Sequence, residues 1–160
     1  MKKEYTLIFY LFSLSFGFGQ VNSDSLNTVI KKATKAIRVN KKDFDAYIAR
    51  AFAKLELNNE KASVKDFSKA IELQPGNAIA WDGRGQANAG IVIEKNFKNP
   101  EIALNDYNKA IELDSGFAMA YNHRGWFKYL LRDKNGACID WQKARELGSS
   151  ASVSDIKDCN

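Results

Sequence analysis

Few side chains in this sequence are of a type that could carry out catalysis or bind a metal. His123 is the only histidine, and no Gly-x-Ser-x-Gly motif offers a serine nucleophile. The two cysteines, Cys138 and Cys159, form no Cys-x-x-Cys motif and complete no metal-ligand spacing with the histidine. No glycine-rich loop for a phosphate group is present either. The sequence therefore predicts no catalytic residue, no metal site, no cofactor and no enzyme; an enzyme accessory or a hydrolase is the alternative from a different class.

One combination of charged residues recurs, an arginine with an aspartate. The three pairs are Arg50 with Asp66, Arg84 with Asp106, and Arg124 with Asp140. A reaction would not be repeated three times unchanged in one short chain, so we interpret the pairs as structural. We expect each arginine to form an ion pair with its aspartate across two neighbouring helices. A partly buried pair of this kind selects which helix meets which, even where its net stabilisation is small.

The elements that must position these side chains are indicated by a recurring phrase. The sequence Lys-Ala-Ile-Glu-Leu, or a degraded copy of it, occurs at residues 35–39, 69–73, 109–113 and 143–147. The alanines in these four copies are 34, 40 and 34 residues apart. A period of this length predicts helical hairpins, each of which buries its apolar face only by stacking on its neighbours.

Three full units, aligned on this phrase, share a pattern of large and small side chains. The first helix of each unit has an aromatic residue, with the arginine three positions later and then a small residue. The second helix has a small residue, then an aromatic residue, then the repeated alanine. The aromatic residues are Tyr47, Trp81 and Tyr121 in the first helices and Phe67, Tyr107 and Trp141 in the second helices. Small residues let two helices approach closely, and the aromatic ones fill the gap between hairpins.

This pattern, with Pro75 closing the first unit, resembles the tetratricopeptide repeat family. The resemblance covers residues 26–148. It implies an all-α fold, a right-handed superhelical solenoid of antiparallel helix hairpins. Its three units would be residues 44–77, 78–117 and 118–148. An adaptor or scaffold that binds a protein or peptide is the function that this resemblance implies.

Shorter elements are expected at the two ends of the solenoid. An unpaired helix at about residues 24–39 would form a half repeat within a linker and capping segment, residues 20–43. A short helix at about residues 151–158 would cap the other end, within a tail of residues 149–160.

The middle unit has six more residues than the first, and they fall between Ala89 and Pro100. We expect its first helix to continue through Ile93 and residues 95–97 to make the turn. Asn99 would then be the N-cap of the second helix, with proline at the first helical position. Such an extension is either a tolerated insertion or a contact element.

The first nineteen residues are expected to be a cleaved secretory signal. Lys2 and Lys3 supply a positive start, an apolar stretch follows at residues 7–18, and Gly17-Phe18-Gly19 precedes Gln20. The apolar stretch is short for a membrane span, which needs about twenty residues. An uncleaved anchor is the alternative. The mature protein would be exported, to the periplasm or out of the cell, without stable membrane insertion.

A second, narrower resemblance supports export. The ending from Gly136 to Gly148 resembles small exported bacterial proteins of the same family. An exported protein meets an oxidising compartment, where an even number of cysteines favours pairing. We expect a disulfide between Cys138 and Cys159, closing a loop of about twenty residues and stabilising the protein by about 3 kcal/mol. The alternative is a buried Cys138 thiol and a free thiol at the end of the chain.

The charge balance does not favour nucleic acid as a partner. The formal net charge is +5, and removal of the first nineteen residues leaves +4, a mild bias. The densest group of cations is Lys31, Lys32, Lys35, Arg38, Lys41 and Lys42. These residues either form a solvated outer face or dock on an acidic envelope component. In the second case the protein would be a structural subunit of an envelope assembly.

The first helices would line the concave surface of a curved solenoid. Helical spacing places six candidate partner-binding residues on it: Ile48, Phe52, Gln86, Asn122, Trp126 and Tyr129. With Ile48, Phe52, Met119, Trp126 and Tyr129, this inner face is unusually apolar and aromatic for a solvated groove, and exposed surfaces of that kind are typical of a partner site. A chain end that covers the groove is the alternative.

The chemistry of this predicted groove limits its ligand. Family members that clamp a peptide C-terminus place Lys, Asn and Arg along the surface, whereas this sequence has Ile48, Phe52, Asp82 and Gln86 there. These residues suit an extended or helical apolar segment of a protein or peptide better than a peptide C-terminus. The oligomeric state is left open by the sequence.

Overall fold

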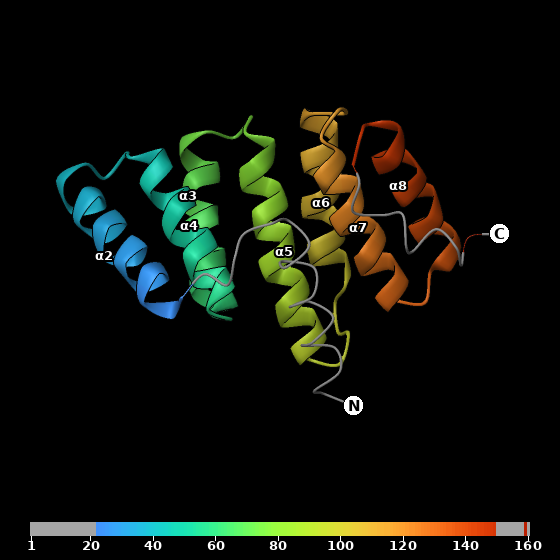
Figure 1. Ribbon diagram of the computed structural model, residues 1–160, viewed down its shortest axis with the longest axis horizontal. Helices are drawn as coiled ribbons and strands as arrows, with labels where there is room; N and C mark the ends of the chain where they lie inside the picture. Colours follow the sequence, from blue (N-terminus) through green and yellow to red (C-terminus); the bar gives the residue numbers. More distant parts are fainter. Residues whose placement is uncertain (1–21, 150–158, 160) are drawn as a thin grey trace.

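The computed structural model describes residues 22–149 and Cys159, and this part of the chain is helical, with no strand. Its helices are α2 (Ser23–Val39), α3 (Phe44–Glu56), α4 (Glu60–Leu73), α5 (Ala78–Glu94), α6 (Glu101–Leu113), α7 (Ala118–Leu130) and α8 (Lys134–Glu146). They follow one another in a row from α2 to α8 (Figure 1). The all-α solenoid that the repeats predict is therefore confirmed. The predicted signal and the predicted helix at 151–158 lie outside the described residues.

The helices form three hairpins, α3 with α4, α5 with α6, and α7 with α8, and α2 packs on the first of them. In the described part of the chain, α3 contacts α5 and α5 contacts α7, whereas α4 makes no such contact with α6, nor α6 with α8. The first helices of the units are therefore closer together than the second helices. They form the inner row of the curved solenoid, on the side where the predicted groove residues lie. None of the helices described is both long enough and apolar enough to cross a bilayer.

Side-chain caps explain where several helices begin. The Asp43 carboxylate accepts a hydrogen bond from the Ala46 amide at 2.9 Å, and the Asn77 side chain accepts one from the Ala80 amide at 3.1 Å. Asp133 caps α8 in the same way, through the Gly136 amide at 2.9 Å. Each cap satisfies an amide that the first turn of the helix leaves without a partner.

The first helix of every hairpin ends in the same way. A residue with left-handed backbone follows each of them: Asn58 (φ 54°), Asn96 (φ 54°) and Arg132 (φ 69°). The amide of Arg132 bonds to the Tyr129 carbonyl, and equivalent bonds form at the other two ends. Left-handed residues of this kind terminate a helix and reverse the chain, and asparagine tolerates the conformation better than arginine does.

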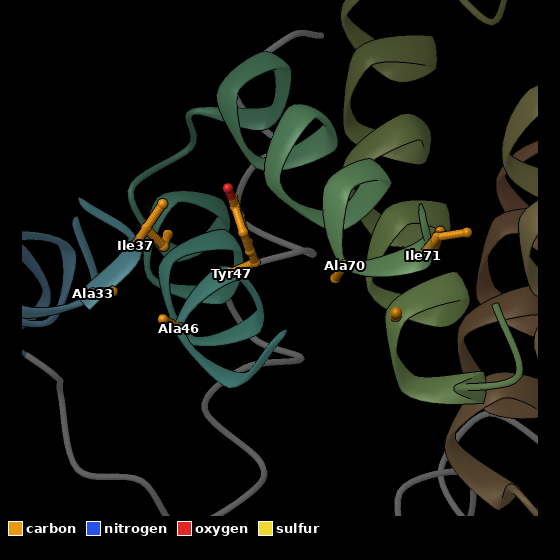
Figure 2. Close-up of a cluster of buried hydrophobic side chains, with 7 residues drawn as sticks. Ala33, Ile37, Ala46, Tyr47, Ala70 and Ile71 are labelled. Carbon is orange, nitrogen blue, oxygen red and sulfur yellow. The ribbon is translucent and has the colours of Figure 1, made fainter. Parts of the chain in front are cut away.

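The core consists of the small and aromatic residues that the repeat pattern selects. Phe67 is 0% exposed, and Tyr107 and Trp141 are 1% exposed. Each of these rings faces a small residue, and Gly125 shows why. A Cβ atom on Gly125 of α7 would lie 2.8 Å from the Trp141 ring of α8. Figure 2 shows the cluster that joins α2 to the first hairpin and α5, with Ile37 and Tyr47 among its members.

The extra residues of the middle unit lengthen its first helix. α5 has 17 residues, whereas α3 and α7 have 13. The added turn is not a free projection: Val92 is 3% exposed and lies in a core cluster with Tyr107 and Phe127, against which Phe97 packs. The contact element considered from the sequence is therefore built largely into the core.

The predicted N-cap of α6 is wrong by one position. Pro100 occupies the N-cap, without a side-chain hydrogen bond, and the helix begins at Glu101. Asn99 has a left-handed backbone, with φ of 57°, and closes the turn through its carbonyl, which accepts from the Ile102 amide. Asn99 adopts the left-handed backbone of this turn, whereas an N-cap residue requires an extended backbone, so Asn99 cannot cap the helix.

Candidate functional site

All three predicted Arg–Asp pairs are present, and each is bidentate. The Nε and Nη2 atoms of Arg50 donate to the two carboxylate oxygens of Asp66, at 2.8 and 2.6 Å. The corresponding distances are 3.0 and 2.6 Å for the second unit, and 2.9 and 2.6 Å for the third. The hydrogen bonds to Asp66 raise the pKa of Arg50, although its partial burial acts in the opposite direction.

Each of these arginines also bonds to the preceding helix. The Nη1 atoms of Arg50, Arg84 and Arg124 donate to Thr34, Ser68 and Asn108, at 3.1, 3.4 and 2.6 Å. One guanidinium thus joins the two helices of its own hairpin and the last helix of the unit before. Because these donors are used by the scaffold itself, the arginines hold the units together and are not available as a catalytic pair.

The six candidate groove residues lie on the inner row of helices, as placed by helical spacing. Ile48 and Phe52 are on α3, Gln86 is on α5, and the other three are on α7. Five of the six are partly exposed. Asn122 differs, because it is 0% exposed. Helical spacing therefore does not predict the complete burial of Asn122.

The three aromatic residues among these candidates, Phe52, Trp126 and Tyr129, each pack on a buried ring of their own hairpin. Phe52 packs edge-on against Phe67, with ring centroids 4.9 Å apart. Trp126 packs edge-on against Trp141 at 5.2 Å, and Tyr129 lies 5.6 Å from the same ring. Contacts of this kind stabilise the hairpin beyond the area they bury. Removal of these rings would therefore change stability as well as any binding.

The middle of the inner row is polar. The Gln86 amide donates to an oxygen of Asp82 at 3.0 Å, and the Nδ1 atom of His123 lies 3.0 Å from both oxygens of that carboxylate. Asp82 is 3% exposed. The sequence analysis missed this contact between α5 and α7, although Asp82 and His123 occupy neighbouring columns of successive units, which was a signal for it.

Asn122 is a buried amide without a partner. Neither its Nδ2 atom nor its Oδ1 atom has a hydrogen-bond partner among the residues that the structure describes. A buried amide in this condition destabilises the fold by about 1–3 kcal/mol relative to a satisfied one. Asn122 is on α7, as are the partly exposed Trp126 and Tyr129, but its amide lies beneath the surface and is not exposed to a ligand.

Two shallow hollows lie at the ends of the solenoid. One, of about 390 Å³, is lined by residues of α7 and α8, including Tyr121, Ile139 and Gln142. The other, of about 370 Å³, lies between α2 and α3, beside Val29 and Ala36. In the described part of the chain, no group of three or more His, Cys, Asp or Glu residues is arranged to hold a metal ion.

Cys138 of α8 and Cys159 are joined by a disulfide. The bond connects residues 21 positions apart, so it attaches the end of the chain to the last hairpin. At the equivalent position in the preceding unit, Leu104 packs on the core cluster that reaches α7. In the last unit, which has no following hairpin among the described residues, the disulfide takes the place of that contact.

Comparisons with known proteins agree with this architecture. The family model of the tetratricopeptide repeat matches residues 44–77, and no curated protein matches the sequence. TTC0263, a thermophilic TPR protein of Thermus thermophilus, is similar over 78% of this chain and 67% of its own, with a TM-score of 0.72 and 17% identity.

Two further solved structures are similar; one has a peptide-binding site and the other has a bound peptide. YrrB, a TPR protein with an unusual peptide-binding site, has a TM-score of 0.69 at 18% identity over 84% of this chain and 67% of its own. The first TPR of Spaghetti (RPAP3), bound to the HSP90 peptide SRMEEVD, has a TM-score of 0.56 at 16% identity over 86% and 92%. Residues 44–77 are thus a tetratricopeptide repeat, and the chain has the fold of the tetratricopeptide repeat proteins.

Proposed function

We propose that this protein is a non-enzymatic adaptor that binds an apolar segment of another protein across the inner row of helices. The observation that carries the proposal is the chemistry of that row at its two ends. Ile48 and Phe52 on α3, and Trp126 and Tyr129 on α7, are partly exposed apolar or aromatic side chains. Such side chains on a concave surface are favoured at partner sites.

The middle of the row suits the backbone of a bound segment. Gln86, on α5, is partly exposed. A segment whose apolar side chains contact the two ends of the row would bring its peptide groups near the Gln86 amide. The peptide-binding site named for YrrB and the peptide bound to the Spaghetti repeat support a peptide as ligand, whereas the apolar character of the segment is inferred from the side chains of this chain alone. The Asp82 carboxylate on this face disfavours a ligand held by its C-terminal carboxylate.

The test compares two exposed isoleucines of almost equal exposure. Ile79, on the inner-row helix α5, is 48% exposed, and Ile102, on the second helix α6, is 49% exposed. Each is replaced by aspartate, which alters the surface without opening the core. Proteins cross-linked in native cells are recovered with the unmodified chain and with both variants. We expect a specific partner to be lost with Ile79→Asp and kept with Ile102→Asp.

Loss with both variants, or with Ile102→Asp alone, would contradict binding along the inner row. Circular dichroism of both variants checks that helicity is unchanged. Ile79 is preferred to Phe52 or Trp126 for this purpose, because those two rings pack on Phe67 and Trp141 in the core.

We also propose that the adaptor acts after export. The positive start and the apolar stretch at residues 7–18 support this location, and a disulfide is typical of proteins outside the cytosol. The mass of the protein recovered from native cells tests it. A chain that starts at Gln20, without free thiols, is expected; a chain that retains residues 1–19, or two free thiols, would contradict it.

A further inference from the structure

We propose that the outer face of α2 docks on an anionic lipid surface, so that the adaptor is held at a membrane without being inserted in it. Four cations of α2, Lys31, Lys32, Lys35 and Arg38, and two of the turn that follows it, Lys41 and Lys42, are named here the α2 basic face. Lys32 lies at the edge of this face, where it lines the hollow between α2 and α3 together with Asp43 and Asp45. All six are exposed, and none forms an ion pair with any residue that the structure describes.

The other second helices show what is unusual about α2. At the position of Lys35, the helices α4, α6 and α8 have Lys69, Lys109 and Lys143. Each of these lysines is paired with a glutamate three residues later, Glu72, Glu112 or Glu146, at 2.6, 2.6 and 3.3 Å. In α2 the residue three positions after Lys35 is Arg38. The repeat pattern supplies an acid here in three helices and a second cation in the fourth.

The consequence for the charge distribution is large. Residues 23–42 contain these six cations and a single acid, Asp24, which gives the segment a net charge of +5. The formal net charge of the whole chain is also +5, so the charges of all other residues sum to zero, with Asp43 and Asp45 just after Lys42. The net positive charge of the chain therefore lies in this segment, at one end of the solenoid. A localised group of four to eight cations on an amphipathic helix is typical of attraction to anionic lipids.

Apolar exposure within the same face favours a lipid surface over an acidic protein. Val39 is 83% exposed and lies between Arg38 and the two lysines of the following turn. A valine at this position gains little from an acidic chain in water, whereas in the interfacial region of a bilayer it is removed from water. The opposite side of α2, with Ala33 and Ile37 at 6% and 5% exposure, is packed on the solenoid. The helix thus has one face for the protein and one for the membrane.

The experiment measures sedimentation with vesicles of phosphatidylcholine, with and without phosphatidylglycerol, at low and high salt. The protein begins at Gln20, because the apolar stretch at residues 7–18 would itself enter a bilayer, while the described fold begins at residue 22 and is retained. We expect binding only to vesicles that contain phosphatidylglycerol, and loss of that binding at high salt.

Arg38→Glu and Lys65→Glu form a matched pair of variants. Each changes the charge by the same amount at an exposed helical position, on α2 and on α4 respectively. Arg38→Glu also gives Lys35 the acidic partner that its equivalents have, so the fold is preserved. A loss of about fivefold in affinity for each unit of charge is expected near a membrane surface, so Arg38→Glu should weaken binding more than about tenfold. Lys65→Glu should leave it within about twofold.

Val39→Ser distinguishes a membrane from other polyanions. It should weaken binding to anionic vesicles and leave binding to polyglutamate in solution unchanged. No binding to anionic vesicles, equal effects of Arg38→Glu and Lys65→Glu, or binding to polyglutamate alone would each overturn the proposal, the last in favour of an acidic protein partner. None of these outcomes depends on the inner groove, which is tested separately with Ile79→Asp.

Discussion

The imidazole of His123 lies 3.0 Å from both carboxylate oxygens of Asp82, and this contact joins the first helices of the second and third hairpins. The single histidine of the chain is thereby given a structural position on the inner row. Gln86 donates to the same carboxylate, so the buried Asp82 has its partners within the scaffold. The polar middle of the inner row is therefore held by contacts within the scaffold.

A double-mutant cycle tests this contact. Asp82→Ala and His123→Ala should each lower the free energy of unfolding by about 1–3 kcal/mol, because each leaves a buried polar group without its partner. The double variant should be more stable than the sum of the two effects predicts, by at least about 0.5 kcal/mol. Urea unfolding followed by circular dichroism provides the values. Strict additivity would show that the two side chains do not interact in solution.

The close approach at Gly125 predicts a loss of stability on adding one methyl group. A Cβ atom there would lie 2.8 Å from the Trp141 ring, which is 1% exposed, and 3.2 Å from the backbone carbonyl oxygen of Ala137. Gly125→Ala should therefore destabilise the protein by about 1–3 kcal/mol, in spite of the better helix propensity of alanine. Gly76→Ala is the matched control, because no atom lies within 4 Å of its added Cβ. A neutral Gly125→Ala would contradict the packing described here.

Arg132 offers a stabilising substitution. It is exposed and has φ of 69°, a backbone conformation that glycine adopts without the steric cost that a side chain incurs. Arg132→Gly should raise the free energy of unfolding by about 1 kcal/mol. The same replacement at Lys65, an exposed position inside α4, should lower it by about 1 kcal/mol. Melting temperatures that move in the same direction for both variants would argue against a left-handed residue at 132.

Tyr107 predicts a specific loss of stability at alkaline pH. Burial raises the pKa of its phenol well above the ordinary value, and the nearby Asp82 and Asp106 carboxylates add to the effect. The unfolded chain releases this proton at about pH 10, whereas the folded chain retains it. The free energy of unfolding should therefore fall as pH rises above about 10, through the range up to the folded pKa.

Tyr107→Phe isolates this contribution, because phenylalanine fills the same space and does not ionise. The stability of the variant relative to the unmodified protein should increase between neutral pH and pH above about 10. Urea midpoints of both proteins along a pH series measure the difference. A constant difference across the series would mean that the phenol is not buried in solution.

The disulfide predicts a dependence on reducing agent. Cys138→Ser/Cys159→Ser should lower the free energy of unfolding by about 3 kcal/mol, because the open loop gives the unfolded chain more freedom. Dithiothreitol should lower the stability of the unmodified protein by the same amount and leave the double variant unchanged. An effect of reductant on the variant would assign the change to some other cause.

The sequence predicts the repeating features of this protein well because each of them is repeated. The Arg–Asp pairs could be predicted from three copies of one spacing, and the small residue at Gly125 from its counterpart Gly85. Features present once had no such support. The Asp82–His123 contact depends on how two successive units are placed, which a pattern within one unit does not contain.

The predictions for Asn99 and Asn122 could not account for backbone conformation and for burial by neighbouring side chains. Asn99 has the residue type of an N-cap, but the tight turn before α6 requires a left-handed backbone there. Asn122 has the helical position of a groove residue, but neighbouring side chains bury it completely. Residue type and helical phase therefore do not determine which side chains are accessible, because accessibility follows from tertiary packing.

Each of the three arginines forms hydrogen bonds both within its own hairpin and to the preceding helix. These shared bonds determine how the molecule would unfold under a pulling force. Arg50 holds both Asp66 of its own hairpin and Thr34 of the preceding helix, and the later arginines repeat the arrangement. A hairpin cannot come apart without loosening its neighbour. When the chain is pulled from its ends, the units should therefore open in sequence from an end, like a zipper, and the middle hairpin should open last.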